Sequence, residues 1–390
     1  MYTSLQTSPV NTQTLDQAVD TLLSRIEKSE EETPTLQIFD QTAFEAVLLL
    51  AQQENASDIH FSGNNRIAIR VNGSLVFLNY DTIDPKIAEE IILSLISDTA
   101  VRDQFLLEKE HDFCFTHKNG VSYRCNAYYK NGYPSISMRC ISGNVPSLDQ
   151  IGAPQKIKSL IQKKQGLIFI CGPTGQGKTT TMAAMINEMN KTRSEHILTL
   201  EDPIEYVFES EKCMISQREL HTDTLSFDKS LRAAMRQDPD IIVIGEVRDR
   251  ETAEAVFKLV ATGHLVISTV HSTNTAQTLY RIVRMFTPGE RDLVLSQMAD
   301  SLLGILNQRL IPTIDGNRTA IFELLLANWA SRNAIRNGDI AQLENTIASS
   351  ADEGMLTFEQ SLSALIREGK VNYSDIASSL EFEPHTHVSL

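Results

Sequence analysis

The chain has 390 residues, with 35 Lys and Arg against 50 Asp and Glu, and a formal net charge of −15 at pH 7. An acidic molecule repels the phosphate backbone of nucleic acids, so general nucleic-acid binding is not expected. At about 150 residues per domain, the length predicts two or three domains. The composition of 42% hydrophobic and 22% charged residues is ordinary for a globular protein, which excludes wholesale disorder and a coiled-coil rod.

Cysteine usage and apolar runs bear on the compartment. The five cysteines form no CxxC pair, so neither a zinc ribbon nor a disulfide framework is suggested. No apolar run approaches the roughly 18 residues that cross a bilayer, and the polar N-terminus lacks the pattern of a secretory signal. We therefore expect a cytoplasmic protein, with attachment to a membrane through a partner left open.

The first 145 residues predict a polar leader followed by a mixed domain. Residues 1–40 are polar, with an amphipathic stretch at 15–26, and predict a short helix and a mobile linker that could also dock a partner. From Phe44, apolar residues recur at helical spacing, and Asn72-Gly73 predicts a hairpin. Strands are expected at residues 59–61, 67–71, 75–77, 123–129 and 136–141 and around Phe113, which together predict an α+β domain over residues 41–145.

The remainder predicts a mainly parallel sheet and a helical C-terminal region. Gly and Pro gather around residues 143–154, so a linker is expected at residues 146–152. From Leu293 onward we expect mostly helix, with core packing of Trp329, a helical region at residues 329–380 and a disordered tail at residues 381–390 in which His385 and His387 hold no metal. Apolar runs that alternate with helical patterns predict a parallel sheet covered on both faces over residues 153–328; the runs are residues 167–171, 197–200, 241–244 and 265–270.

A glycine-rich segment directly follows the first of these strands. Residues 172–179 match GxxxxGK[ST] between a strand and a helix former, the context typical of a phosphate-binding loop. Glycines let backbone N–H groups approach phosphate oxygens, and the following helix presents its positive end to the anion. Lys178 is expected to reach the β and γ phosphates, and the Thr179 hydroxyl to bind Mg²⁺. The candidate nucleotide-binding residues are Gly172, Pro173, Thr174, Gly175, Gln176, Gly177, Lys178, Thr179 and Thr180.

Two acidic clusters end neighbouring strands of the predicted sheet. Glu201 and Glu205 follow the strand at residues 197–200, and Glu246 follows the strand at residues 241–244. A glycine before Glu246 is expected to clear space near the nucleotide. Ligands of open parallel sheets gather at these strand ends, and hydrolysis needs carboxylates that hold magnesium and orient water. Either cluster alone would more often be a solvated turn, but beside a phosphate loop the pair predicts a hydrolytic site.

Histidines flank the last of the four strands. His264 precedes residues 265–270 and His271 follows them. A histidine beside a γ-phosphate can donate a hydrogen bond to it, because imidazole titrates near neutral pH. A single histidine at such a position would more often be structural, so the residues alone leave the role of this pair open.

Together these motifs resemble the secretion ATPases of type II and type IV systems, and most closely the PilT-like retraction motors of type IV pili. The resemblance runs from about residue 44 to residue 379. Its carriers are residues 56–60 (ASDIH), 172–179, 201–205 (EDPIE), 217–219 (QRE), 231–240, 245–249 (GEVRD) and 262–271. The resemblance implies a PAS-like N-terminal domain joined to a RecA-like P-loop ATPase domain, six-membered rings, and ATP held between the two domains.

The resemblance also implies roles for individual residues. Glu246 takes the position of the glutamate that polarises the attacking water, and Glu205 that of a carboxylate that aids it directly or through Mg²⁺. Thr179, Glu205 and Glu246 would then be the metal-binding residues, and His264 and His271 would sense the γ-phosphate.

Arginines of the N-terminal domain neutralise phosphate charge in this family. Arg124 and Arg139 fall where that pattern expects them. Lys130 stands where an arginine is usual, and a lysine cannot form the same bidentate clamp.

The kind of motor is a separate question. Extension ATPases of the same superfamily usually carry a tetracysteine zinc insert and a large extra N-terminal domain, and we expect neither in this protein. Retraction ATPases carry the C-terminal sequence AIRNLIRE, and residues 330–337 (ASRNAIRN) keep part of it but depart at Ser331, Ala334 and Asn337. The stretch at residues 353–370 again resembles retraction motors, whereas the long leader and residues 311–319 resemble ATPases of type IVB secretion and conjugation.

Three functions therefore compete. The first is a hexameric motor for pilus retraction that acts on an inner-membrane platform protein, and the second is a secretion or conjugation ATPase. The third is a ring that binds nucleotide without hydrolysing it and modulates a second motor. The acidic and histidine residues of a hydrolytic site favour the first two.

Overall fold

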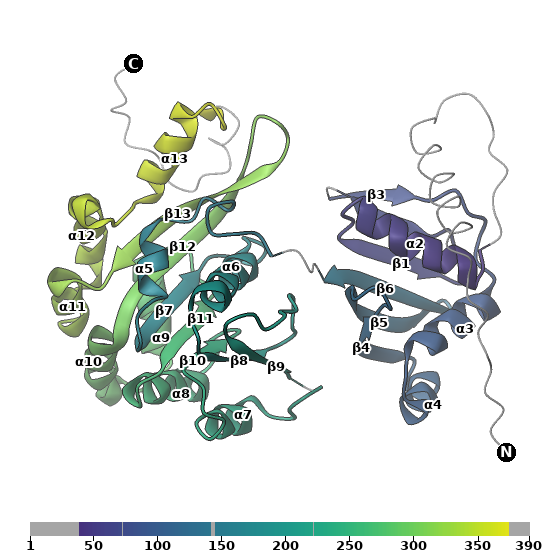
Figure 1. Cartoon of the computed structure of the whole chain (residues 1–390), viewed down its shortest axis with the longest axis horizontal. Helices are drawn as coiled ribbons and strands as arrows, with labels where there is room; N and C mark the ends of the chain where they lie inside the picture. Colours follow the sequence, from purple (N-terminus) through teal and green to yellow (C-terminus); the bar gives the residue numbers. More distant parts are fainter. Residues whose placement is uncertain (1–38, 72, 142–144, 221, 374–390) are drawn as a thin grey trace. The chain divides into compact units, whose positions relative to one another are not determined.

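The structure is a computed structural model that describes residues 39–71, 73–141, 145–220 and 222–373. The chain divides into two compact units, residues 1–143 and residues 144–390, and each is described by itself (Figure 1). The helix predicted at residues 15–26 and the pair His385 and His387 lie outside the described residues. No helix in the described ranges combines the length and the apolar character needed to cross a membrane.

The first unit is built on a six-stranded antiparallel sheet in the order β3-β2-β1-β6-β5-β4. The strands are β1 (Asp58–Ser62), β2 (Ala68–Val71), β3 (Ser74–Phe77), β4 (Glu110–Thr116), β5 (Ser122–Lys130) and β6 (Tyr133–Ile141). The helices are α2 (Gln41–Gln53), α3 (Pro85–Leu95) and α4 (Thr99–Glu108). This confirms the predicted strands and the hairpin at Gly73, where β2 pairs with β3.

Local sequence explains these elements. Asp40, Asp84 and Asp98 each cap the helix that follows by accepting a backbone N–H on the side chain. In β1, buried Ile59 and Phe61 alternate with partly exposed neighbours, so one face of the sheet joins an apolar core and the other carries polar residues.

The second unit is built on a seven-stranded sheet in the order β13-β12-β7-β11-β10-β8-β9. All neighbouring pairs are parallel except β12 and β13. The strands are β7 (Gly166–Cys171), β8 (His196–Glu201), β9 (Met214–Glu219), β10 (Ile241–Ile244), β11 (Leu265–Val270), β12 (Leu302–Pro312) and β13 (Arg318–Leu326).

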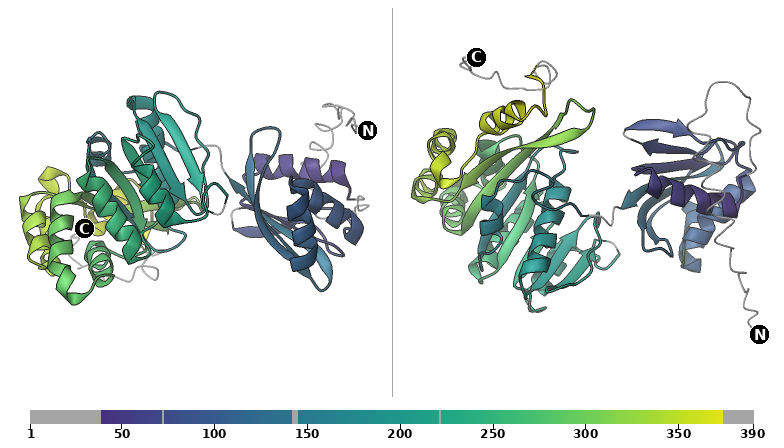
Figure 2. Two further views of the ribbon diagram at one scale, coloured as in Figure 1. Left: turned by 90° about the horizontal axis from the view of Figure 1, so that it is seen from below. Right: turned by 45° about the horizontal axis from the view of Figure 1, so that its top comes forward.

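Helices cover both faces of this sheet (Figure 2). The helices are α5 (Lys156–Leu160), α6 (Lys178–Thr192), α7 (Phe227–Ala234), α8 (Arg250–Ala261), α9 (Thr275–Arg284), α10 (Arg291–Ser301), α11 (Trp329–Arg336), α12 (Leu343–Ser349) and α13 (Phe358–Arg367). One core contains Ile168 and Ile170 of β7 with α5 and α6, and the other contains Leu167 and Phe169 with helices α7 to α12. Because successive residues of β7 face opposite cores, the strand is apolar throughout, as predicted.

The expectation of mostly helix after Leu293 is wrong for residues 302–326. These residues form the long antiparallel hairpin of β12 and β13, which extends the sheet beyond β7. The sequence pattern concealed it because β12 includes buried Asn307 and Gln308, which interrupt an apolar strand pattern. Core packing of Trp329 is also wrong, since its side chain is 82% exposed at the first residue of α11.

Candidate nucleotide site

The phosphate loop connects the end of β7 to the start of α6, as predicted. Gly172, Gly175 and Gly177 have φ values of +154°, +77° and +78°, which side chains with a Cβ rarely adopt. The loop leads into α6 at Lys178, so the free N–H groups of the first helical turn follow it directly. This backbone fits a phosphate group, which backbone N–H donors at a helix N-terminus bind.

Lys178 is held by the loop that precedes it. Its side chain is buried, and its Nζ donates to the carbonyl oxygens of Gly172 at 2.8 Å and Pro173 at 2.9 Å. Burial lowers the pKa of Lys178, while the negative charges of Glu246 and Glu205 oppose that shift. The ammonium group therefore lies inside the loop, with both predicted carboxylates near enough to act on it.

Glu246 follows β10, and only β11 lies between β10 and β7 in the sheet. Its segment is fixed by the Val247 N–H, which donates to the carbonyl of Thr269 on β11 at 3.0 Å. A Cβ at Gly245 would lie 3.4 Å from the carbonyl oxygen of Leu200 at the end of β8, which is an ordinary van der Waals contact.

His271 joins Glu246 to the phosphate loop. Its Nε2 lies 3.3 Å from the Glu246 carboxylate, and its Nδ1 lies 3.1 Å from the hydroxyl of Thr174. The Glu246 contact is an ion-pair distance, whereas the contact with Thr174 is a hydrogen bond whose direction follows the tautomer of the imidazole. Burial lowers the pKa of His271, Lys178 lowers it further, and Glu246 opposes both.

Arg248 contacts the same oxygen of this carboxylate as His271 does. Its Nε donates to Glu246 Oε2 at 2.7 Å, and its Nη1 lies 3.4 Å from the carboxylate of Asp202. The hydrogen bond with Glu246 raises the pKa of Arg248. Arg248 and Asp202 were not predicted as site residues, although both lie inside the acidic motifs.

His264 lies at the opposite end of β11 from the phosphate loop. It therefore does not reach the γ-phosphate position of its own chain, where the sequence predicted a sensor. Its backbone carbonyl accepts from Gly166 at the start of β7, whereas the phosphate loop begins where β7 ends. A strand of six residues separates the two ends by about 20 Å. The imidazole Nδ1 instead lies 2.9 Å from the carbonyl of Leu259, at the end of α8.

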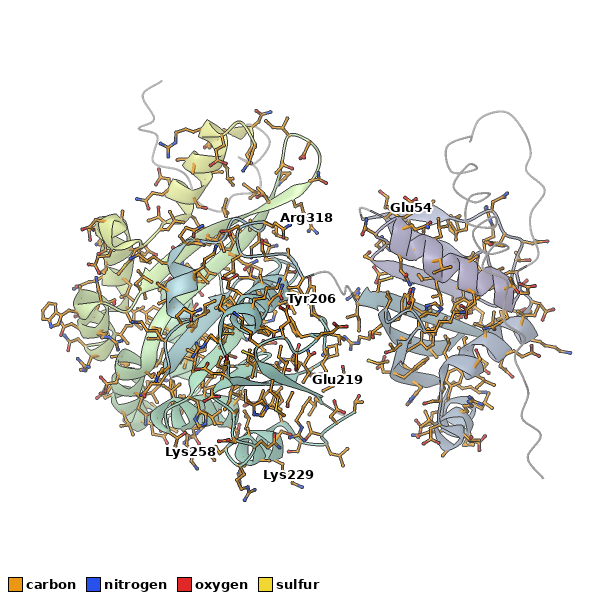
Figure 3. The ribbon with its side chains drawn as sticks, viewed as in Figure 1. Glu54, Tyr206, Glu219, Lys229, Lys258 and Arg318 are labelled. Atoms are coloured by element: carbon orange, nitrogen blue, oxygen red, sulfur yellow. The ribbon has the colours of Figure 1, made fainter. Side chains whose placement is uncertain are left out.

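One buried glutamate ends β8 and one exposed glutamate follows it. Glu205 is exposed, and Tyr206 beside it, labelled in Figure 3, lies 3.0 Å from the Thr180 hydroxyl of α6. Glu201 is buried, and its Oε1 accepts from Thr199 at 2.6 Å and from Gln217 at 3.3 Å. Burial raises the pKa of Glu201.

The metal-binding potential of the site depends on the nucleotide. In the described parts of the chain, no group of three or more His, Cys, Asp or Glu could hold a metal ion. Mg²⁺ usually binds one or two protein oxygens together with phosphate oxygens and waters. The Thr179 hydroxyl at the start of α6 and the carboxylates of Glu205 and Glu246 are oxygen donors of the kind that such a site uses. Phosphate oxygens and waters would complete the coordination of Mg²⁺.

The two predicted arginines lie together in the first unit. Arg124 and Arg139 are directly opposite each other on β5 and β6, and both are exposed. Arg139 donates to Asp58 on β1 at 3.0 Å, and Arg70 on β2 lies 3.8 Å from the same carboxylate. The polar face of the six-stranded sheet therefore carries a row of three arginines with one acidic partner.

Two further residues contact the phosphate loop and the loop after β11. Asn307 and Gln308 of β12 are both buried, and Gln308 donates to the carbonyl of Gln176. Sequence reasoning missed both because it expected helix here. Two adjacent amides in an otherwise apolar stretch were the available signal, since buried amides require hydrogen-bond partners.

A phosphate loop after the first strand of a parallel sheet, with a carboxylate and a histidine at neighbouring strand ends, defines a P-loop nucleotide-binding protein. The family model described as type II/IV secretion system protein matches residues 30–342. The chain belongs to this family.

Curated relatives agree with this assignment. The chain is 37% identical over 328 residues to the type IV pilus retraction ATPase PilT of Pseudomonas aeruginosa, covering 84% of this chain and 94% of that protein. It is 40% identical over 304 residues to a twitching motility protein of Neisseria gonorrhoeae, covering 78% of this chain and 81% of that protein. The chain is an ATPase of this family.

Solved structures give the same fold. A crystal structure of the pilus retraction motor PilT with bound ADP superposes with a TM-score of 0.80 at 35% identity, covering 86% of this chain and 96% of that one. The ATPase DotB of Legionella pneumophila superposes with a TM-score of 0.76 at 26% identity, covering 90% and 98%. The predicted arrangement of an N-terminal domain before a RecA-like ATPase domain is confirmed.

Proposed function

We propose that the chain is an ATP-hydrolysing motor that powers the retraction of type IV pili. The observation that carries this proposal is the 37% identity to a pilus retraction ATPase over 94% of that protein. The site supports it, because the phosphate loop, Lys178, Glu246 and His271 converge at the same edge of one sheet.

The residues of the site divide the work of hydrolysis. Loop N–H groups and Lys178 bind the β and γ phosphates, and Glu246 orients and polarises the attacking water. His271 fixes Glu246 relative to Thr174, so a change in the loop alters the position of the carboxylate. When bound, Mg²⁺ neutralises phosphate charge, and Thr179 would hold it, with Glu205 and Glu246 as further oxygen ligands.

The proposal includes a role for the N-terminal unit. Residues 41–145 would form the PAS-like domain, residues 146–152 the linker, residues 153–328 the ATPase core and residues 329–380 the helical region. Arg124 and Arg139 would neutralise the phosphates of ATP when the two domains close. Positive charges that meet the γ-phosphate only in the closed form favour that form, so ATP binding would shift the domains toward closure.

A retraction motor also needs partners. We infer a homo-hexamer in the cytoplasm, attached to the inner membrane by binding a platform protein of the pilus machine. A second motor ATPase would be a further partner. The net charge of −15 supports the absence of nucleic acid from these partners.

Pilus retraction in living cells tests this function. In a deletion strain that carries the Lys178→Ala variant, we expect surface pili to be present while retraction of labelled pili and twitching are lost. The control is Lys191→Ala, which removes an exposed lysine from the last turn of the same helix and should restore retraction. Normal retraction in the Lys178→Ala strain would refute the proposal.

Export by a secretion or conjugation machine is the second candidate. The family description, type II/IV secretion system protein, favours it, whereas the 37% identity to a pilus retraction ATPase favours retraction. The same deletion strain separates the two functions, because loss of substrate export with normal pilus retraction would indicate the second. The non-hydrolysing ring is tested by phosphate release from the purified protein.

A further inference from the structure

A short segment of β12 lies between the two loops that carry the nucleotide site. β12 pairs with β7 in parallel, and Asn307 is directly opposite Cys171, the last residue before the phosphate loop. The next residue of β12, Gln308, therefore lies beside Gly172. Residues 307–310, which we call the β12 strip, contact both the phosphate loop and the loop after β11.

The β12 strip holds the phosphate loop by two hydrogen bonds that involve glutamine side chains. Gln308 donates from its side chain to the backbone carbonyl of Gln176. Gln176 in turn accepts the backbone N–H of Leu310 on its side-chain oxygen at 2.6 Å. The fit is close, because a Cβ at Gly172 would lie 2.6 Å from the Gln308 carbonyl oxygen and one at Gly177 would lie 3.2 Å from the Gln308 amide nitrogen.

The same strip holds the segment that follows His271. Asn307 donates to the Thr275 hydroxyl at 2.8 Å and to the Glu323 carboxylate at 3.0 Å. Glu323 Oε1 also accepts the backbone N–H of Thr275 at 3.0 Å and its hydroxyl at 2.8 Å. Arg309 adds a bond to the carbonyl of Thr273 at 3.3 Å. The start of α9 is thereby fixed to β12 and β13.

Burial strengthens the hydrogen bonds of the β12 strip. Asn307, Gln308 and Thr275 are at most 2% exposed, and Glu323 is 9% exposed. Hydrogen bonds in such a dry environment are strong, and moving one loop away would leave a buried amide or carboxylate without its partner. The two loops therefore cannot shift independently without breaking bonds to the strip.

We propose that Asn307 and Gln308 are positioning residues for ATP turnover. They fix the phosphate loop and the loop after β11, which carries His271, in one relative geometry. Gln308 acts on the loop that binds ATP, and Asn307 acts on the loop that places His271 against Glu246. The strip continues into the hairpin whose second strand begins at Arg318, labelled in Figure 3, so both loops are tied to one rigid element. This inference rests on the proposed hydrolysis of ATP at this site.

Kinetics of two variants test the proposal. Gln308→Leu removes the donor to the phosphate loop, so the KM and the Kd for ATP should rise about tenfold with a smaller change in kcat. Asn307→Leu removes the donor to Thr275 and Glu323 and so loosens the loop that carries His271; kcat should fall about tenfold while the KM stays within about twofold. Phosphate release and calorimetric titration with ATP on the purified full chain measure both effects.

The split between KM and kcat distinguishes positioning from a general loss of stability, which would not separate the two parameters in this way. Gln342→Leu, at an exposed position, is the matched control and should keep both wild-type values. Gln308→Met keeps the side-chain length without the donor and replaces Gln308→Leu if that variant fails to fold.

The outcomes are distinct. Wild-type kcat, KM and Kd in folded Asn307→Leu and Gln308 variants would overturn the inference while leaving the proposed function intact. Absence of phosphate release from the wild-type chain would instead refute hydrolysis, and the Kd for ATP would then still show whether Gln308 positions the phosphate loop.

Discussion

At the scale of single residues, the proposed hydrolysis depends on one carboxylate, and two side chains contact the same oxygen of it. Arg248 and His271 both contact Glu246 Oε2, and the side chain of Glu246 is 14% exposed. This fixes the direction in which the carboxylate points, which an exposed glutamate would not maintain. The motif predicted Glu246 and His271, but only the structure identifies which of the two histidines reaches it.

Replacement of the two histidines tests that distinction. His271→Gln breaks the link between Thr174 and Glu246, so we expect kcat for ATP hydrolysis to fall about 100-fold with little change in KM. His264→Gln, at the far end of β11, should hydrolyse ATP within about twofold of wild type. Equal losses in the two variants would contradict the positions described.

Glu201 gives a prediction about stability and pH. Burial raises its pKa in the folded protein above the ordinary value of 4.5, so above that pH the unfolded chain releases the proton more readily than the folded chain. The stability that this group contributes is therefore lost as the pH rises through the folded pKa. Glu201→Gln keeps an oxygen for Thr199 and removes the titration.

Urea unfolding at two pH values measures this effect. We expect the Glu201→Gln variant to gain stability over wild type at pH 8 and to gain less at pH 5. The control is Glu251→Gln in the first turn of α8, where the carboxyl is exposed. A gain that is larger at pH 5 than at pH 8 would show that Glu201 is not titrating as described.

At the scale of elements, the retraction-type segment at residues 330–337 is a structural connection. Arg332 of α11 donates to the carbonyl oxygens of Ala299 and Asp300 at the end of α10 and of Leu302 at the start of β12. Those are carbonyls that a helix end leaves unpaired, and a cation there also suits the helix dipole. Arg332 thus fixes the turn from α10 into β12.

Arg332→Ala should lower the free energy of unfolding by about 2 kcal/mol, because several carbonyls lose a charged donor. Arg336→Ala, which removes an exposed ion pair with Asp300, should cost about 0.5 kcal/mol. Chemical denaturation of both variants provides the measurement. Similar losses in the two variants would assign Arg332 to the solvated surface.

How far sequence predicts these elements depends on what surrounds them. Strands such as β7 and β10 are apolar throughout and were predicted, because they are buried on both faces. The hairpin of β12 and β13 was not, since Asn307 and Gln308 interrupt its apolar pattern and contact residues far away in the sequence. The site residues inside a motif were predictable, whereas those contributed by β12 depend on tertiary packing.

At the scale of the whole molecule, two units with separate cores share one proposed task. The row of Arg70, Asp58, Arg139 and Arg124 lies on the first unit, and the phosphate loop lies on the second. Arg124 and Arg139 of this row are exposed, and the proposed function assigns these two to the phosphates of ATP.

We expect Arg124→Ala to raise the KM for ATP about tenfold and to weaken its dependence on salt, because the proposed phosphate contact would be lost. Arg70→Ala, in the same row and without an assigned role in ATP binding, is the matched control and should change the KM less than twofold. Equal effects of the two substitutions would remove the assignment of Arg124.

The central claim is that Glu246 promotes hydrolysis of ATP bound to the phosphate loop, and phosphate release by the purified chain tests it most directly. The wild-type protein should release phosphate only with Mg²⁺ and ATP, and Glu246→Gln should lower kcat about 100-fold while ATP still binds. Hydrolysis by Glu246→Gln at the wild-type rate would contradict the account.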